Sequence, residues 1–482
     1  MRHVVTLSRS WGTASFVALC AVFVVAGVVA GRLVAAPSTQ VLTLAGSAAL
    51  IYFALFVWQP AAAVLAYIAL RPLVDAFVFQ QVAGFTLGEL WGLGMVLSAC
   101  LYLLLENADD KDKLKLPAAP IAFLFFVLML SITRPPLTGA ITSWTKIASW
   151  ILVMLVCERI SRNARGQRMT WWTGIAMGAM LTLAVTVMIR QHRYGSAFYA
   201  NWGTGLKLGG QLPHALSMAA VLLLPFALVG VMFIAPRILS LAISAGLLMA
   251  IFLSYVRTAL LGSVVVLAAL LVLAFRFGGR IRTAGIAVAA GVGVAVFIAR
   301  DRILQRFSDL TLLSSSGATQ SEAGSGRMGI WSTYLDHAFD NVVHTLVGRG
   351  ANAAELLGVT VFGRQSGAHN DTIELLLSGG VVLVACFIVL IVWMAATPVR
   401  TLRDPEQSQP TKAFAALALG AVLAFALMSQ LNGIVFYQSS VVIGLVVGLV
   451  RGMAATPGET FLDLDPAAET QPADIPSTRT GT

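Results

Sequence analysis

The chain has 482 residues, of which 58% are hydrophobic and 11% are charged. Soluble domains carry roughly 25% charged residues, so this composition and a mean hydropathy of +0.84 exclude a protein built mainly from soluble domains. The formal net charge of +10 would suggest a nucleic-acid partner for a soluble chain. Here the basic residues flank apolar runs, as in a membrane protein, and no nucleic-acid partner is expected.

Apolar runs of about 20 residues, the length of a bilayer-spanning helix, follow one another along the chain. Arg2 and Arg9 precede the first run as in a signal peptide, but the run is long and many others follow, so an uncleaved helix is expected. The fold class predicted is all-α, a polytopic transmembrane helical bundle of about 12–14 spans. The expected spans are 13–35, 39–58, 60–80, 86–105, 117–133, 144–157, 170–190, 212–234, 238–256, 258–276, 283–300, 372–397, 413–432 and 436–452.

The four cysteines lie in or beside apolar runs without the spacing of a metal site. They are interpreted as packed thiols, with no disulfide framework. Within the run 60–80, Arg71 and Asp75 lie four residues apart on one helical face, which suggests an intramembrane ion pair.

The short loops set the expected orientation, because basic residues concentrate on the cytoplasmic side. With both termini in the cytoplasm, the basic loops face inward: Lys111, Lys113 and Lys115; Arg159, Arg162, Arg165 and Arg168; Arg276, Arg280 and Arg282; Arg400, Arg403 and Lys412. The tail 455–482 has the composition of a disordered segment.

Two long loops, 190–211 and 301–371, then face outward and carry arginines against the charge rule. They suggest a cationic outer cavity that attracts an anionic substrate. In the second loop, 308–326 is typical of a flexible lead-in. Apolar residues at intervals of three and four predict an amphipathic helix over 328–346, ended by Gly348 and Gly350, that lies on the membrane surface.

Three features point to chemistry. Arg257 lies between two apolar runs. A charge buried there is costly and indicates a function, unless the side chain extends to the membrane interface. Arg327 begins the amphipathic helix, where it would grip a phosphate or a lipid headgroup. His369 precedes the span at 372, and nearby arginines would keep its imidazole neutral and able to act as a general base; a lone histidine is otherwise more often structural.

These features resemble a family pattern when they are taken in order. Gly326-Arg327…Trp331, then Gly348-Arg349-Gly350, His369-Asn370, Glu374 and Gly379-Gly380 resemble the shared membrane domain of bacterial O-antigen ligases and Wzy-type polysaccharide polymerases. The upstream Ser254…Arg257-Thr258-Ala259 is similar to their "S-R-x-A" element, although Tyr255 and Val256 intervene. The resemblance covers about 205–395.

The resemblance implies glycosyl transfer at the outer face of the bacterial cytoplasmic (inner) membrane. The donor would be an oligosaccharide on undecaprenyl pyrophosphate, and the acceptor a glycan or lipid A–core. His369 would act on the acceptor hydroxyl, and Arg257 and Arg327 would bind the pyrophosphate. Family members work without a metal ion, so no cofactor is expected, and direct displacement would invert the anomeric centre.

The chain departs from the family pattern after the first outer loop, where relatives often carry Asn and this sequence has Gln211 and His214. Secondary site candidates are His214, Asn370 and three arginines: Arg190, Arg193 and Arg349. The predicted organisation is N-terminal helices over 1–204, the ligase/polymerase-like domain over 205–395 with its periplasmic loop 301–371, C-terminal helices over 396–454 and a cytoplasmic tail over 455–482.

Three functions remain open at this stage. The Ala/Val-rich spans, Arg71-Pro72-Leu73 and the acidic tail favour an exopolysaccharide or O-antigen polymerase, working with membrane lipids and a chain-length regulator as partners. A ligase that forms lipopolysaccharide would use the same His and Arg chemistry. A transporter or flippase for lipid-linked sugar would favour broken helices and an internal repeat, and no repeat is visible in the sequence.

Overall fold

The computed structural model describes residues 51–76, 81–82, 85–109, 117–132, 137–193, 199–202, 205–208, 213–234, 237–254, 256–277, 279–311, 327–363, 367–433 and 440–456. Several predictions lie outside these residues. They concern the first span, most of the second, the lysines at 111–115, most of the lead-in 308–326, Gln211 and nearly all of the tail.

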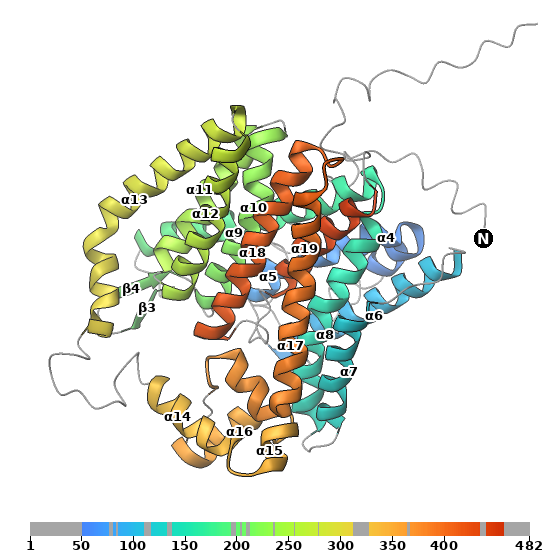
Figure 1. Cartoon of the computed structure of the whole chain (residues 1–482), viewed down its shortest axis with the longest axis vertical. Coiled ribbons are helices and arrows are strands. Elements are labelled where there is room, and N and C mark those ends of the chain that lie inside the picture. Colours follow the sequence, from blue (N-terminus) through green and yellow to red (C-terminus); the bar gives the residue numbers. More distant parts are fainter. Residues whose placement is uncertain are drawn as a thin grey trace, which may run out of the picture.

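Helices make up nearly all of the described structure (Figure 1). The bundle contains α4 (Pro60–Ala69), α5 (Arg71–Ala76), α6 (Leu87–Asp109), α7 (Ala118–Ile132), α8 (Leu137–Ile160), α9 (Ala164–Arg193), α10 (Pro213–Phe233), α11 (Arg237–Ser254), α12 (Arg257–Phe277), α13 (Gly279–Thr311), α17 (Asp371–Arg403), α18 (Gln409–Asn432) and α19 (Ser440–Ala454). Two antiparallel ribbons join helices: β1 (Gln81–Val82) with β2 (Phe85–Thr86), and β3 (Tyr199–Trp202) with β4 (Gly205–Leu208).

Six helices of the described part are long and apolar enough to cross a membrane: Gly88–Glu106, Ala215–Phe233, Arg237–Ser254, Arg257–Phe277, Asp371–Arg403 and Gln409–Asn432. Shorter apolar helices accompany them, among them Ala118–Ile132 and Ser440–Ala454. The prediction of a polytopic helical membrane bundle is confirmed. The expected run 60–80 is divided at Leu70 into α4 and α5, and the total of 12–14 spans stays a prediction.

Glycines allow close approach of the central helices, as is common between membrane helices. A Cβ on Gly174 of α9 would lie 2.5 Å from the Phe226 ring of α10, and one on Gly444 of α19 would lie 2.4 Å from the Trp150 carbonyl oxygen of α8. Any larger residue would therefore push these helix pairs apart.

The basic residues of the short loops gather at one end of the bundle. There Arg451 of α19 pairs with Glu158 of α8 at 2.6 Å, and Arg162 lies 3.9 Å from the same carboxylate. Arg159 pairs with Glu106 of α6 at 3.8 Å. That this end faces the cytoplasm stays a prediction from the positive-inside rule.

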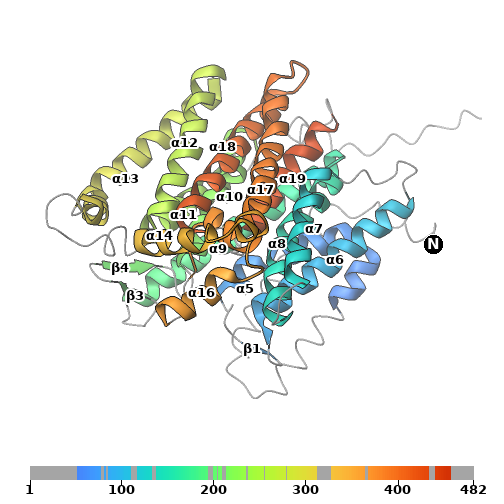
Figure 2. The ribbon, with the colours of Figure 1, turned by 60° about the horizontal axis from the view of Figure 1, so that its bottom comes forward.

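The opposite end carries three short helices: α14 (Arg327–Ala338), α15 (Val342–Val347) and α16 (Ala353–Phe362). They lie together below the bundle in Figure 1 and pack on α17, and Figure 2 brings this end forward. Their shared core contains Tyr334 and Ala338 of α14, Ala353 and Ala354 of α16, and Leu377 of α17. We call these three helices the outer cluster.

The predicted single helix over 328–346 is wrong in one respect, because it is divided between Ala338 and Val342. Asn341 has extended backbone angles, and its side chain caps α15 by accepting a hydrogen bond from the His344 N–H. Gly348 ends α15 with φ 72°, as predicted. The helix α16 was not predicted.

The boundaries of the two outer loops also differ from prediction. α13 extends to Thr311 instead of ending near residue 300, because Ile303, Phe307 and Leu310 continue the helical spacing and no glycine interrupts it. The first outer loop contains the end of α9 and the β3–β4 ribbon.

The predicted span 372–397 is broken, which corrects the sequence interpretation. Gly380 has φ 64° and ψ −166°, so α17 consists of a short helix before this residue and a long one after it. The Arg349 and Gly350 N–H groups donate to the Leu377 and Ser378 carbonyls at 2.6 and 2.9 Å. The outer cluster thus satisfies carbonyl groups that the end of the short helix leaves without intrahelical donors.

Candidate active site

The candidate residues converge on the end of α18. Helix α12 runs antiparallel to α18, since a Cβ on Gly420 would lie 2.9 Å from Ala269 Cβ, and one on Gly262 would lie 2.9 Å from Met428 Sδ. Arg257, the first residue of α12, is five residues before Gly262. At about 1.5 Å per residue, this register puts Arg257 level with the end of α18.

Arg327, the first residue of α14, reaches the same place. Its guanidinium donates to the Leu431 carbonyl oxygen at 2.6 Å and to Asn432 Oδ1 at 3.1 Å. Both of these acceptors are neutral groups. These contacts join the outer cluster to α18 across more than 100 residues of sequence and fix the guanidinium at the mouth of the bundle.

His369 lies in a tight turn directly before α17. Its φ is 51°, a left-handed conformation that is uncommon for a residue other than glycine. The Trp331 indole donates to the Ala368 carbonyl at 2.7 Å, and Glu374 Oε1 accepts from the Ala368 N–H at 2.9 Å. Two side chains from different helices therefore hold the peptide groups beside the histidine.

Asn370 holds the other side of this turn. Its Oδ1 accepts from the Ile373 N–H at 3.1 Å, which caps α17, and its Nδ2 donates to the Gln430 carbonyl at 2.8 Å. Thr372 Oγ1 donates to Gln430 Oε1 at 2.8 Å. Asn370, predicted as a secondary site residue, thus positions the turn against α18.

The electrostatics of His369 agree with the sequence prediction. Burial lowers the pKa of His369 from its ordinary value of 6.5, and the positive charge of Arg327 lowers the pKa further. The imidazole is therefore neutral at neutral pH and able to accept a proton. Arg327 therefore lies close enough to His369 for its charge to act on the imidazole.

Several residues of this end were not predicted from sequence to belong to the site. Gln430 and Asn432 contact Asn370 and Arg327, as described above, and Asp371 is fully buried next to Gly433. A signal was present, because Ser429-Gln430-Leu431-Asn432-Gly433 places polar residues at the end of an apolar run. Glu374 was noted only as part of the family pattern.

The secondary candidates His214, Arg190 and Arg193 are on helix ends near this site. Asn432 Nδ2 lies 4.0 Å from Met218 Sδ, so the first turn of α10, with His214, is at the same end of the bundle. Helix α9 runs antiparallel to α10, since Gly174 meets Phe226 and Trp171 meets Gly230. Its last turn, with Arg190 and Arg193, therefore lies near the start of α10. Their side chains are outside the description.

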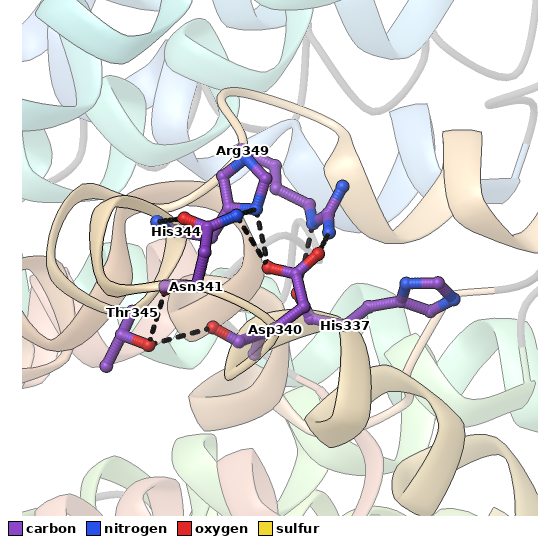
Figure 3. A network of polar contacts seen from close by, with 7 residues as sticks. His337, Asp340, Asn341, His344, Thr345 and Arg349 are labelled. Atoms are coloured by element: carbon purple, nitrogen blue, oxygen red, sulfur yellow. Dashed lines mark hydrogen bonds and ion pairs between the residues drawn. The ribbon is translucent and has the colours of Figure 1, made fainter.

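Arg349 has a structural role in the outer cluster. Its guanidinium pairs with Asp340 and donates to the His337 carbonyl at 3.1 Å (Figure 3). The hydrogen bond from His344 and the charge of Arg349 lower the pKa of Asp340. This network closes the link between α14 and α15, and the role of Arg349 as a phosphate contact stays a prediction.

Arg71 lies apart from these residues. It is 2% exposed, and its guanidinium stacks 4.3 Å from the centre of the Trp91 ring of α6, a cation–π contact. The Asp75 side chain is outside the description, so the ion pair between the two stays a prediction.

The described residues include no group of three or more His, Cys, Asp or Glu that could hold a metal ion. Among them, Cys100, Cys157 and Cys386 are free thiols. This end offers a neutral imidazole beside the fixed guanidinium of Arg327, an arrangement suited to an anionic substrate that carries a reacting hydroxyl nearby.

Part of the chain is similar to a known protein family. The family model for O-antigen ligase matches residues 240–388, the segment from α11 to the first part of α17, and confirms the resemblance drawn from the motifs. No curated protein matches the chain. The matched segment contains Arg257, Arg327, Arg349 and His369.

Proposed function

Because residues 240–388 match the O-antigen ligase family model, we propose that the chain is a membrane glycosyltransferase acting on glycans linked to undecaprenyl pyrophosphate. The observation that carries this proposal is the convergence of Arg327 and His369 on the end of α18, with Arg257 level with the same end. The positive-inside rule favours the outer face of the cytoplasmic membrane for this end.

In this proposal the two arginines bind the donor pyrophosphate. Charge develops on the pyrophosphate as the bond between the sugar C1 and the phosphate oxygen breaks, and fixed guanidinium groups stabilise that charge. Arg327 is suited to this role because α18 holds its guanidinium before substrate arrives, so little reorganisation is needed.

His369 takes the proton. The hydroxyl of the acceptor sugar attacks C1, the new glycosidic bond forms, and the hydroxyl proton passes to the neutral imidazole. The Trp331, Glu374 and Asn370 contacts hold the backbone of the turn that carries the ring. Inversion at C1 and independence from metal ions belong to the same proposal.

Polymerase is the preferred form of this activity, on the sequence features that favour exopolysaccharide or O-antigen polymerases. A chain-length regulator would then be a partner. Ligation of the glycan to lipid A–core is the second candidate, favoured by the description of the matching family as O-antigen ligase. Both forms use the same histidine and arginines.

The test replaces His369→Ala and Arg327→Met in the native strain and resolves surface glycans on a gel. His337→Ala is the matched control, because His337 is on α14 in the outer cluster and only its carbonyl is used there. The expected result is loss of long glycan in both site variants and normal glycan in the control, at equal levels of inserted protein. Normal glycan in both site variants would overturn the assignment.

The pattern of loss separates the forms of the function. Single repeats that remain attached to lipid A–core indicate a polymerase. Unmodified lipid A–core together with long glycan on its polyprenyl carrier indicates a ligase. Lipid-linked glycan that accumulates on the cytoplasmic face indicates a transporter and contradicts the proposal.

A further inference from the structure

Helix α15 has its apolar side exposed and its polar side turned inward. At 100° per residue, Val342, Val343, Leu346 and Val347 share one side of the helix. Their exposed fractions are 74%, 64%, 50% and 51%. His344 and Thr345 are on the other side and face the protein, where they bond to residues of the link between α14 and α15.

The charged residues of this region are less exposed than the valines. The side chains of Asp340, His344 and Arg349 are 37%, 24% and 20% exposed. A helix that packs against a protein in water has the reverse arrangement, with apolar residues inward and charged residues outward. Four neighbouring aliphatic side chains on the outside of a small helix indicate that water does not cover this side.

The polar groups of the region bond to one another, as Figure 3 shows. Asp340 accepts from Asn341 Nδ2 at 3.0 Å and lies 2.7 Å from His344 Nδ1, and its other oxygen pairs with Arg349. Thr345 Oγ1 donates to the Asn341 carbonyl at 2.9 Å. Polar groups near hydrocarbon must be paired within the protein in this way.

The exposed side is continuous with the surface of the spanning helices. The end of α15 packs against the break in α17, since a Cβ on Gly380 would lie 2.3 Å from the Leu346 carbonyl carbon. Leu130 of α7 meets the neighbouring Gly379. Next to these contacts, Ile132 of α7 and Val381 of α17 are 58% and 45% exposed. In a membrane protein such apolar residues on the outside of spanning helices face lipid.

We propose that α15 is an interfacial helix whose apolar side lies among the acyl chains of the adjacent membrane leaflet. Its polar side then faces the protein through the Asp340–Arg349 pair. The helix seats the outer cluster on the membrane, and with it Arg327 and the Trp331 contact to the His369 turn. This membrane contact is independent of the glycosyl transfer proposed above. If α15 does not contact lipid, the proposed role of His369 is unchanged.

The test uses a fluorescent probe on a single cysteine, introduced by Val343→Cys, in a protein whose four native cysteines are replaced by alanine. Asp336→Cys, at an exposed position of α14, is the matched control. The proteins are placed in lipid nanodiscs, and an unchanged gel-filtration profile shows that each is folded. Val342→Cys supplies a second position on the same side if the first variant is unstable.

Two quenchers locate the probe. A lipid with a nitroxide near the carboxyl end of its acyl chain reports contact with the leaflet, and dissolved iodide reports contact with water. We expect the Val343 probe to lose most of its emission to the nitroxide lipid and little to iodide, and the Asp336 probe to show the reverse. Equal quenching of both probes by iodide would overturn the proposal. Protection of the Val343 probe from both quenchers would also overturn it, since a second copy or another protein would then cover the helix.

Discussion

The contact between Glu374 and the Ala368 N–H gives the sharpest test of how the His369 turn is held. The Glu374→Leu substitution keeps a side chain of similar size and removes the acceptor at 2.9 Å. Ala368 is fully buried, and leaving a buried N–H without an acceptor costs about 1–3 kcal/mol. A left-handed residue other than glycine costs on the order of 1–2 kcal/mol, so this contact is comparable in size to the strain at His369, whose φ is 51°.

Loss of the contact therefore shifts the turn toward relaxed conformations in which the imidazole leaves its place. Without the contact, the backbone strain of about 1–2 kcal/mol is no longer offset. At a tenfold change in the equilibrium constant for each 1.4 kcal/mol or so, the share of protein with a competent turn falls roughly 5- to 30-fold, and the rate falls with it. Glu374→Gln is the matched control. It keeps an oxygen at the same position without the charge, and we expect its activity within about threefold of the native protein.

The assay measures surface glycan per molecule of inserted protein in a strain that lacks the native gene, at expression low enough for the enzyme to limit synthesis. The thermal unfolding midpoint of each purified protein is measured in parallel, so that loss of folded protein is distinguished from loss of a competent turn. Activity of Glu374→Leu close to that of the native protein would refute the proposal that the Glu374 contact holds the His369 turn. Equal loss in Glu374→Gln would show that the charge, and not the acceptor geometry, matters.

Two further predictions concern pH and the break in α17. The pKa of His369 lies below its ordinary value of 6.5 and the neutral imidazole is the competent form, so glycan synthesis in membrane vesicles should stay level from neutral pH down to that value and fall only in more acid solution. Arg327→Met removes a charge that lowers this pKa, so the acid limb of its residual activity should move to higher pH. An acid limb at unchanged pH would contradict the electrostatic effect of Arg327 on His369. Gly380→Ala should prevent stable insertion, measured by gel filtration in detergent, because its Cβ would lie 2.3 Å from the Leu346 carbonyl carbon. Gly363→Ala has a similar φ of 67° and nothing within 4 Å, so it should cost only about 1–2 kcal/mol, and equal damage in the two variants would show that backbone strain rather than contact matters at Gly380.

The sequence allowed the class of protein and the main chemical residues to be predicted for a physical reason. Membrane helices must satisfy their own backbone hydrogen bonds and present apolar side chains to lipid, so their signal is local and strong. Arg257, Arg327 and His369 were identified because charged or titratable residues beside such helices are costly without a function. The contact between Arg327 and α18 was not predictable in this way, because it depends on packing between segments more than 100 residues apart in sequence.

The contacts of Arg349 also could not be predicted from the sequence. In the sequence it is one more arginine in an outer loop, next to two glycines and equal in rank to Arg190 and Arg193. Its partner Asp340 is nine residues away and is brought close only because the predicted helix 328–346 is divided at Asn341. If residues 328–346 formed one continuous helix, Asp340 and Arg349 would lie apart. The sequence therefore suggested that Arg349 could bind substrate.

The break at Gly380 connects these observations. Irregular backbone at the boundary of a membrane is stable only where protein covers it and satisfies its polar groups. Here the segment after α15 donates to the Leu377 and Ser378 carbonyls, and Asn370 caps the other end of the same short helix. That helix follows His369 directly, so the position of the imidazole depends on both of its ends. The outer cluster is therefore required for the geometry of the site as well as for covering it, and this explains why its arginines divide between two tasks, Arg327 at the mouth of the bundle and Arg349 within the link that supports it.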